Sequence, residues 1–519
     1  MIRMYRNPHE RAFVSKTERC VEIKKVYQFY VLLVLILLVV TIGYYLTGDH
    51  VKTIRSIAVL PLLDPSYPPG QEYFIDGMTE AVITELSKIK ALRVISPTTI
   101  MRYKSTKKSL PDIARELSVD AIVRGSVQRV GERILIKLEL IEPDPERRIW
   151  TNAYERDLDD ILTMQEEVAR DISREIKIAV TPEEKARLTD AGSVDPDAHE
   201  AYLKGRFQIN KWTKSSIEKG IEYFERAIEL DPRNALAYAG LAKSYDILAS
   251  FDWILPDIGW PKARSAALKA LEIDGTIAEA QVVLADVKFM YDWDWNAAER
   301  DFRRAIDLNP GSSEARIFYA GYLMSHKRFD EAFKEMLLAQ EHDPLSFSVK
   351  RLAMILYIFS RQYEQARRQI REILDFDPAN YEAHYLLGWV CKENAQYDEA
   401  IEQYWTALSL AGESPADSLR AIAGLARTYA LSGDTEKARI HLDNLLDKSK
   451  RAYITPYIVA KVFAILGETD LAFEWLEKAY LDRSPYLSTI LIDPELDNIR
   501  GDPRFNAFLR KMGFDVDSS

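Results

Sequence analysis

Three prolines in the second half of the chain stand 34 residues apart, and each follows Asn or Asp: Pro310, Pro344 and Pro378. Small or apolar residues recur at fixed offsets before them: Ala298, Phe302 and Ala305, then Ala332, Met336 and Ala339, then Ala366, Ile370 and Ile373. A repeat of this length predicts two helices per unit, which cross where the side chains are small. The proline ends the second helix, because it cannot continue the hydrogen-bonded ladder. The sequence therefore predicts a stack of helical hairpins.

The same frame runs from residue 198 to residue 484 and gives eight units. Within the sixth unit, Leu387-Gly388 and Cys391 occupy positions where small and apolar residues recur in the first helix. The period and these positions resemble the tetratricopeptide repeat, and the resemblance implies an all-α (α-α) superhelix. An open helical stack needs a cap over its last apolar face, so we expect residues 485–519 to form that cap.

The resemblance also implies a concave groove that the first helix of each unit lines. Reading the groove positions of units five to eight gives seven candidate peptide-binding residues: Arg351, Tyr385, Trp389, Lys392, Arg427, Tyr457 and Lys461. Four cations and three aromatic rings suit an extended protein segment that carries carboxylates. The asparagines of chaperone-binding relatives are missing from these positions, so their two-carboxylate clamp is not reproduced. The alternative is that the rings pack between units and the cations are solvated.

The beginning of the chain predicts a basic tail followed by a membrane-spanning helix. Residues 1–25 hold seven Lys or Arg against three Glu, and residues 26–46 hold no charge. About 20 apolar residues span a bilayer, and basic flanks stay in the cytoplasm. We therefore expect a single transmembrane helix in the inner membrane, a cytoplasmic amino terminus and an extracytoplasmic remainder. A cleaved signal peptide and a buried core helix are the alternatives.

Residues 53–180 predict a small α/β domain, which a linker at 181–197 joins to the repeats. Short apolar segments typical of strands alternate with segments that have the apolar spacing of a helix. A half-buried strand is indicated by apolar residues at every second position: Ile134, Ile136, Leu138 and Leu140. Three stretches resemble the TolB amino-terminal-like module: Phe74–Glu80, Asp120–Val127, and Trp150 with Tyr154 and Arg156. In relatives with this layout, a winged-helix DNA-binding domain or a class III nucleotide cyclase domain precedes the membrane helix. This sequence carries neither.

The composition and the motifs favour a binding protein over an enzyme. The net charge is −11, which argues against a nucleic-acid partner. The two cysteines, Cys20 and Cys391, form no metal or redox motif, and no phosphate loop, nucleophile elbow or His-based metal pattern occurs. We expect no cofactor and no catalytic site.

Two functions remain open at this stage. The first is a membrane-anchored protein-protein interaction scaffold in the bacterial cell envelope, with a protein or peptide in the repeat groove. The second is a sensory half that acts with a separate cytoplasmic effector, which would be a transcription regulator, a kinase or a cyclase. Four tryptophans in two interruptions of the repeats form either local core or a partner patch: Trp253, Trp260, Trp293 and Trp295. The sequence leaves the oligomeric state open.

Overall fold

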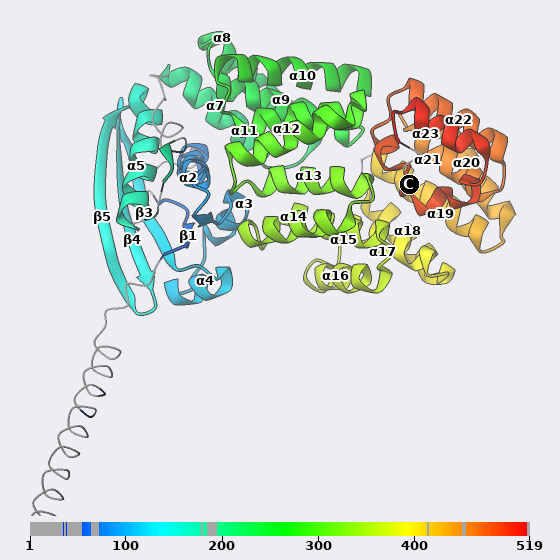
Figure 1. Cartoon of the computed structure of the whole chain (residues 1–519), viewed down its shortest axis with the longest axis horizontal. Coiled ribbons are helices and arrows are strands. Elements are labelled where there is room, and N and C mark those ends of the chain that lie inside the picture. Colours follow the sequence, from blue (N-terminus) through cyan, green and yellow to red (C-terminus); the bar gives the residue numbers. More distant parts are fainter. Residues whose placement is uncertain are drawn as a thin grey trace, which may run out of the picture. The chain divides into compact units, whose positions relative to one another are not determined.

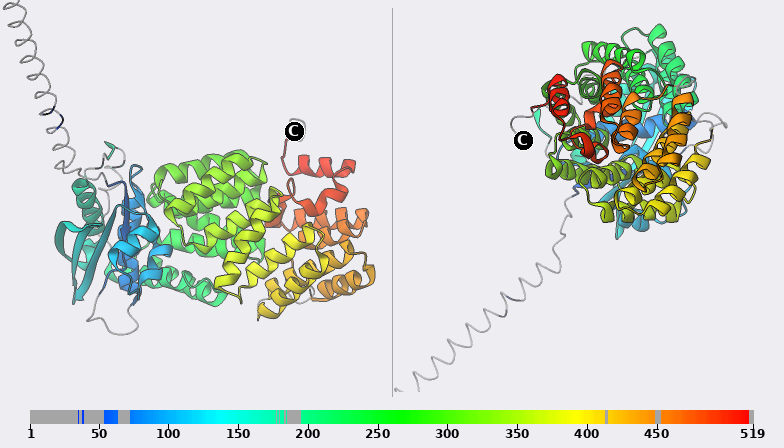
Figure 2. Two further views of the ribbon diagram at one scale, coloured as in Figure 1. Left: turned by 90° about the horizontal axis from the view of Figure 1, so that it is seen from below. Right: turned by 90° about the vertical axis from the view of Figure 1, so that its right-hand side faces the viewer.

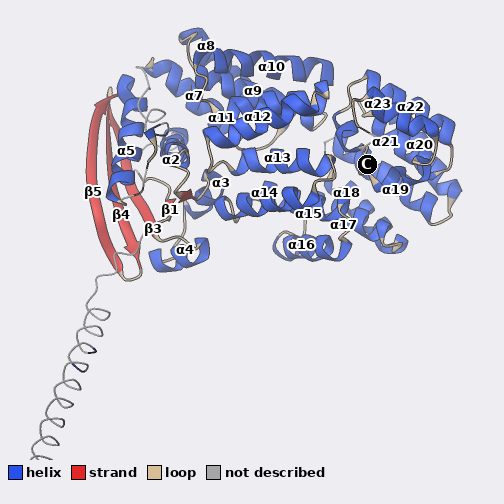
Figure 3. Cartoon of the chain, viewed as in Figure 1, coloured by secondary structure: helices blue, strands red, loops and turns tan. Residues whose placement is uncertain are grey.

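A computed structural model describes residues 35, 38, 54–63, 72–176, 178, 180–182, 184, 195–412, 415–448 and 453–515 of the chain. Residues 54–519 form one compact unit. All the strands lie in the first part of the described chain, where helices alternate with them, and only helices follow, as Figures 1 and 3 show. The predicted linker at 181–197 lies largely outside the described residues.

Five strands form one sheet in the order β2-β1-β3-β4-β5. They are β1 (Ser56–Val59), β2 (Arg93–Val94), β3 (Ala121–Val130), β4 (Arg133–Pro143) and β5 (Glu146–Asp157). β1 is parallel to β2 and β3, whereas β3, β4 and β5 form an antiparallel meander. The four alternating residues of β4, from Ile134 to Leu140, are all buried, as the period of two predicts.

Helices α2 (Glu72–Ser87) and α5 (Ile161–Glu175) pack on each other and against the sheet. The short helices α3 (Pro97–Ile100), η1 (Met101–Tyr103), α4 (Leu110–Leu117) and η2 (Leu158–Asp160) complete this α/β region.

Sixteen helices of the described chain form eight consecutive pairs after residue 195, the number of units that the sequence predicts. The pairs are α7 (Pro196–Ile209) with α8 (Lys214–Leu230), α9 (Ala235–Ser250) with α10 (Pro256–Ile273), α11 (Ala278–Val287) with α12 (Trp295–Leu308), α13 (Ser313–Ser325) with α14 (Phe329–His342), α15 (Phe347–Phe359) with α16 (Tyr363–Phe376), α17 (Tyr381–Glu393) with α18 (Tyr397–Leu410), α19 (Pro415–Leu431) with α20 (Thr435–Lys448), and α21 (Pro456–Ile465) with α22 (Thr469–Leu481). A π-helical turn, η3 (Lys288–Asp292), extends α11. Figure 2 shows the pairs side by side.

Polar residues fix where the first helices of the units begin. The side chains of Asn234, Ser312, Ser346 and Asn380 each accept a hydrogen bond from the backbone N–H three residues on. These caps satisfy donors that have no partner inside the helix. Farther along, the small residues of the repeat frame, such as Ala332 and Ala366, are completely buried where the two helices of a unit cross.

The predicted fold class included a transmembrane helix, and this part of the prediction is wrong. No helix among the described residues is long and apolar enough to cross a membrane. The fold of the described chain is therefore a small α/β domain followed by an all-α tetratricopeptide superhelix. The predicted tail at 1–25 and the predicted span at 26–46 lie outside the described residues, apart from Leu35 and Leu38.

After the last pair, the chain folds back as η4 (Pro485–Thr489), η5 (Pro494–Ile499) and α23 (Pro503–Lys511). This carboxyl-terminal segment reaches the third unit. The indole nitrogen of Trp295 donates to the carbonyl oxygen of Met512 at 3.0 Å, and its ring stacks on Phe514 with centroids 4.6 Å apart. The ring of Trp293 lies 5.0 Å from that of Tyr480.

The tryptophans of the two interruptions are therefore mostly core. Trp260, Trp293 and Trp295 are buried. Trp253 is half-buried and packs on Phe251, with ring centroids 5.5 Å apart. The alternative that they form local core is therefore confirmed for these side chains. Part of this core comes from the last unit and the carboxyl-terminal segment.

We predict that replacing Ala332 with arginine lowers the free energy of unfolding by more than about 3 kcal/mol, because a long charged side chain would have to enter a full helix crossing. The matched control is Gln340→Arg on the exposed side of the same helix, for which we expect less than about 0.5 kcal/mol. Melting followed by circular dichroism measures both. Equal shifts would mean that the repeat frame is misassigned.

Candidate peptide-binding groove

Four helices supply the seven predicted groove residues. Arg351 lies on α15, Arg427 lies on α19, and Tyr457 and Lys461 lie four residues apart on α21. Tyr385, Trp389 and Lys392 lie on α17 at spacings of four and three, which places them on one face of that helix. All seven lie on the first helix of a unit.

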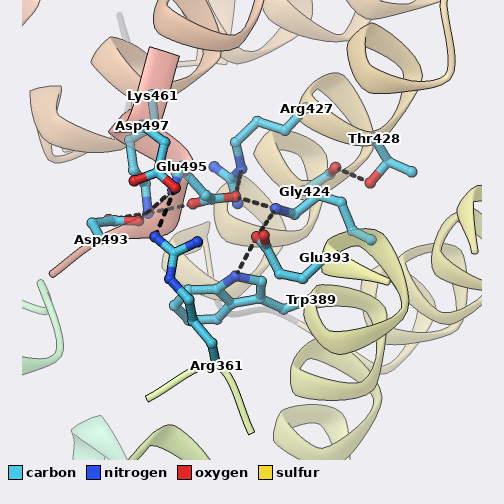
Figure 4. Close-up of polar contacts among 11 residues, drawn as sticks. Arg361, Trp389, Glu393, Gly424, Arg427, Thr428, Lys461, Asp493, Glu495 and Asp497 are labelled. Carbon is cyan, nitrogen blue, oxygen red and sulfur yellow. Dashed lines mark hydrogen bonds and ion pairs between the residues drawn. The ribbon is translucent and has the colours of Figure 1, made fainter. Parts of the chain in front are cut away.

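Three of the four predicted cations converge on one carboxylate, that of Glu495 in η5 (Figure 4). Its oxygens lie 2.9 Å from Nζ of Lys392, 2.7 Å from Nε of Arg427 and 2.6 Å from Nζ of Lys461. All four side chains are buried. These contacts are ion pairs in which three positive charges share one buried carboxylate.

Asp493, two residues earlier, forms a second contact of the same kind. Its carboxylate accepts a hydrogen bond from the hydroxyl of Tyr457 at 2.9 Å and lies 3.2 Å from Nζ of Lys461. Arg500 donates to the carbonyl oxygen of Asp493 at 2.7 Å and to that of Leu491 at 3.0 Å. The segment therefore presents two carboxylates to the cations while Arg500 holds its backbone.

Trp389 lies at the edge of this cluster and is half-buried. Its indole nitrogen donates to Glu393 at 3.0 Å, and Glu393 also pairs with Lys392. Nζ of Lys461 lies 5.6 Å from the centre of the Trp389 ring and 5.3 Å from that of Tyr457. Cations and aromatic rings therefore lie side by side at this place, and Tyr457 and Lys461 are buried.

Arg351 and Tyr385 belong to a neighbouring cluster around Glu382. Nε of Arg351 donates to Glu382 at 2.9 Å, and Arg420 pairs with the same carboxylate at 3.3 Å. The guanidinium of Arg420 also lies 4.4 Å from the centre of the Tyr385 ring. Arg420 was not among the predicted groove residues, although it stands one helical turn before Gly424 on α19.

Burial and charge oppose each other at the carboxylates. Burial raises the pKa of Glu495, but the positive charges of Arg427, Lys392 and Lys461 outweigh it and hold that pKa well below its ordinary value. Glu382 behaves in the same way: burial raises its pKa, and Arg420 and Arg351 lower it to about 2. Burial lowers the pKa of Lys461, and the charges of Asp493 and Glu495 raise it above the ordinary value. All these groups are therefore charged at neutral pH.

The first helices of units one to four hold a separate network. Glu279 accepts from Arg206 at 2.6 Å and from Lys243 at 2.9 Å, and Lys243 also bonds Glu314 at 2.9 Å. Arg206 reaches Glu80 of the α/β domain as well. The buried Asp246 and Asp286 lie close together nearby, and burial followed by their mutual repulsion raises the pKa of Asp246 well above its ordinary value. Among the described residues no group of His, Cys, Asp and Glu is suited to a metal ion.

Sequence reasoning missed the acids that complete the groove. The repeat frame places the cations on the array, but it contains nothing about the path of the chain after the last helix. The sequence did contain a signal for these acids, because Asp493, Glu495 and Asp497 occur close together in the predicted cap. Their charges could have been matched to the predicted cations.

The comparisons with known proteins agree with the repeats. Models of the tetratricopeptide repeat match residues 211–234, 289–346 and 355–418, so the chain contains tetratricopeptide repeats. A solved structure of pilF from Pseudomonas aeruginosa is 19% identical and covers 40% of this chain and 92% of that chain, with a TM-score of 0.31.

Two curated relatives are longer than the matched region. Putative adenylate cyclase 3 of Rhizobium meliloti (strain 1021) is 33% identical over 232 residues, which are 44% of this chain and 39% of the relative. The transcriptional regulator HilA of Salmonella typhimurium (strain LT2) is 19% identical over 294 residues, which are 56% of this chain and 51% of the relative. The chain thus spans about two fifths to one half of the length of the relatives it matches.

We predict that Glu495→Gln lowers the free energy of unfolding of the carboxyl-terminal units by about 3–5 kcal/mol, because three buried cations lose their shared counter-charge. The control, Glu436→Gln, changes an exposed side chain on α20. Because the folded pKa of Glu495 is depressed, its contribution is present above the unfolded pKa and is lost as the pH falls. The difference between wild type and Glu495→Gln should therefore shrink in acid. A difference that does not change with pH would contradict the ion-pair assignment.

Proposed function

We propose that the tetratricopeptide array is a protein-protein interaction scaffold that binds an acidic protein segment in the groove of units five to eight. The observation that carries this proposal is the convergence of Lys392, Arg427 and Lys461 on two carboxylates of a non-repeat segment. The array thus has a site that binds the side-chain carboxylates of a segment outside the repeats.

The chemistry of the groove sets what kind of segment fits. Cations in a water-poor place favour carboxylates over neutral groups, because an unpaired buried charge is costly. The aromatic rings of Trp389 and Tyr457 offer apolar faces beside those cations, which suit the aliphatic stems of the segment. Specificity then comes from the spacing of the acids.

Two finer features belong to this proposal. The first is the assignment of residues 53–180 to the TolB amino-terminal-like module, which rests on the stretches from Phe74 to Arg156. The second is an extracytoplasmic location in the bacterial cell envelope, which rests on the charge pattern of residues 1–46.

The location has a direct test. A reporter enzyme that folds only outside the cytoplasm, fused after Ser519, should be active in cells that produce the full chain. A reporter that works only in the cytoplasm should be silent at the same position. The opposite pattern would overturn the proposed location.

A second candidate function is a regulatory half that acts on a separate effector protein. The names of the curated relatives favour it, since one is a putative adenylate cyclase and the other a transcriptional regulator. This function and the scaffold share the groove and differ in the identity of the bound protein.

We predict that a photo-crosslinking amino acid at position 351 or 389 of the full chain captures one and the same protein in cells. Both side chains are partly accessible, that of Arg351 to 33%. The matched control position is Trp405 on α18, which is 47% exposed. Capture at 405 alone, or of unrelated proteins at 351 and 389, would contradict groove binding.

The captured protein is then purified and titrated against the chain. Arg351→Glu should weaken binding at least tenfold, and Trp405→Ala should leave it unchanged. A cyclase or transcription regulator as the captured protein would support the regulatory half, whereas another envelope protein would support the scaffold.

A further inference from the structure

We propose that residues 493–497 act as an internal ligand, which occupies the cationic part of the groove and which an acidic segment of the partner replaces. This inference rests on the proposed function and deepens it, because it names both the partner's chemistry and the regulation of the site. The partner segment would carry two carboxylates two residues apart, in the manner of Asp493 and Glu495.

The first reason is that most of the acids that pair with the three buried cations come from outside the repeats. The described ion pairs of Lys392, Arg427 and Lys461 involve three acids, and of these only Glu393 lies on a repeat helix. Asp493 and Glu495 both come from the carboxyl-terminal segment. If that segment left, the array would keep three clustered cations and one carboxylate.

This imbalance makes exchange more favourable than simple release. A buried cation without a partner is strongly destabilising, whereas a buried pair contributes little compared with an apolar pair. A departing segment therefore needs a replacement that restores two negative charges at the same places. A neutral or basic protein segment cannot supply them, and the groove becomes selective for acidic partners.

The way in which the segment is held is the second reason. Residues 494–499 form a 3-10 helix, a conformation with poorer hydrogen-bond geometry than the α-helix. Glu495 contacts the array through charge pairs of its side chain with Lys392, Arg427 and Lys461. The described polar contacts that hold Asp493 and Glu495 to the array are thus contacts of carboxylates, which an acidic segment of a partner also carries.

An exposed ion pair closes the segment from outside. Asp497 lies 2.7 Å from Arg361, which stands at the turn between α15 and α16, and the side chains are 39% and 55% exposed. Ile490 and Ile499, on either side of the segment, are buried and keep it tethered. A tethered internal ligand competes at high effective concentration, so the wild-type groove should bind outside peptides weakly.

The test uses the full chain and a fluorescein-labelled synthetic peptide with the sequence of residues 488–501, followed by fluorescence anisotropy. Asp497→Ala removes the carboxylate that pairs with Arg361 and Arg500 and leaves the buried charges in place, and it should bind the peptide at least tenfold more tightly than wild type. The control Asp470→Ala removes another exposed pair of the cap, with Arg504, and should bind like wild type. A peptide with Asn and Gln in place of the residues at 493 and 495 should bind at least tenfold more weakly.

Hydrogen exchange of the same proteins provides a second readout. We expect the amides of residues 490–500 to exchange faster in Asp497→Ala than in wild type, and to be protected again when the acidic peptide is added. Equal peptide affinity of wild type and Asp497→Ala would overturn the internal ligand. So would the absence of peptide binding together with unchanged protection of residues 490–500.

These results are distinguishable from a failure of the proposed function. If the partner captured at position 389 binds wild type and Asp497→Ala equally, the groove is a binding site without an internal ligand. If no partner binds the groove at all, the proposed function fails, whatever the peptide does. Dimers of Asp497→Ala in light scattering would identify a second copy as the occupant, and that would overturn the proposed exchange with a partner.

Discussion

A stack of helical hairpins always leaves two apolar ends, and this constraint shapes the rest of the chain. Each unit buries its inner face only against a neighbour, so the first and last units need covers of a different kind. The α/β domain provides one. Leu203 of α7 is part of its core, and a Cβ added to Gly77 of α2 would come within 2.5 Å of the Leu203 side chain. The carboxyl-terminal segment provides the other.

The second cover does more than hide an apolar face. A cap made only of Leu496, Ile499 and Phe505 would satisfy the hydrophobic requirement of the last units. Instead the segment carries two carboxylates into a cluster of buried cations. Buried ion pairs stabilise little relative to apolar packing, but they penalise any arrangement that separates the charges. The charges therefore specify where the segment lies, and they also specify what could take its place.

The sequence was sufficient for features that repeat and insufficient for features that occur once. The period predicted the helix pairs and the buried alanines, because each of these follows from a constant spacing. The resemblance to the repeat family placed Lys392, Arg427 and Lys461 on the first helices of their units, where the structure has them. It could not place Glu495, since the return of the chain over the last unit depends on packing at one place only. The same holds for the fourth unit's contact with the α/β domain, where Thr99 donates to Asp343 at 2.6 Å. The expected membrane-spanning helix rested on the uncharged stretch at 26–46 and on its basic flank, and no described helix has the required length and apolarity.

Cations at both ends of the array pair with acids that lie outside the repeats. In the amino-terminal half, Arg206 of the first unit pairs both with Glu279 of the array and with Glu80 of the α/β domain. In the carboxyl-terminal half, Lys461 pairs with acids of the cap. Each half thus has charges that an element outside the array neutralises. Because a buried charge needs its partner, movement of either cover would change the charge that the adjacent half of the groove presents. Access to the groove and the position of its covers are therefore linked by the same ion pairs.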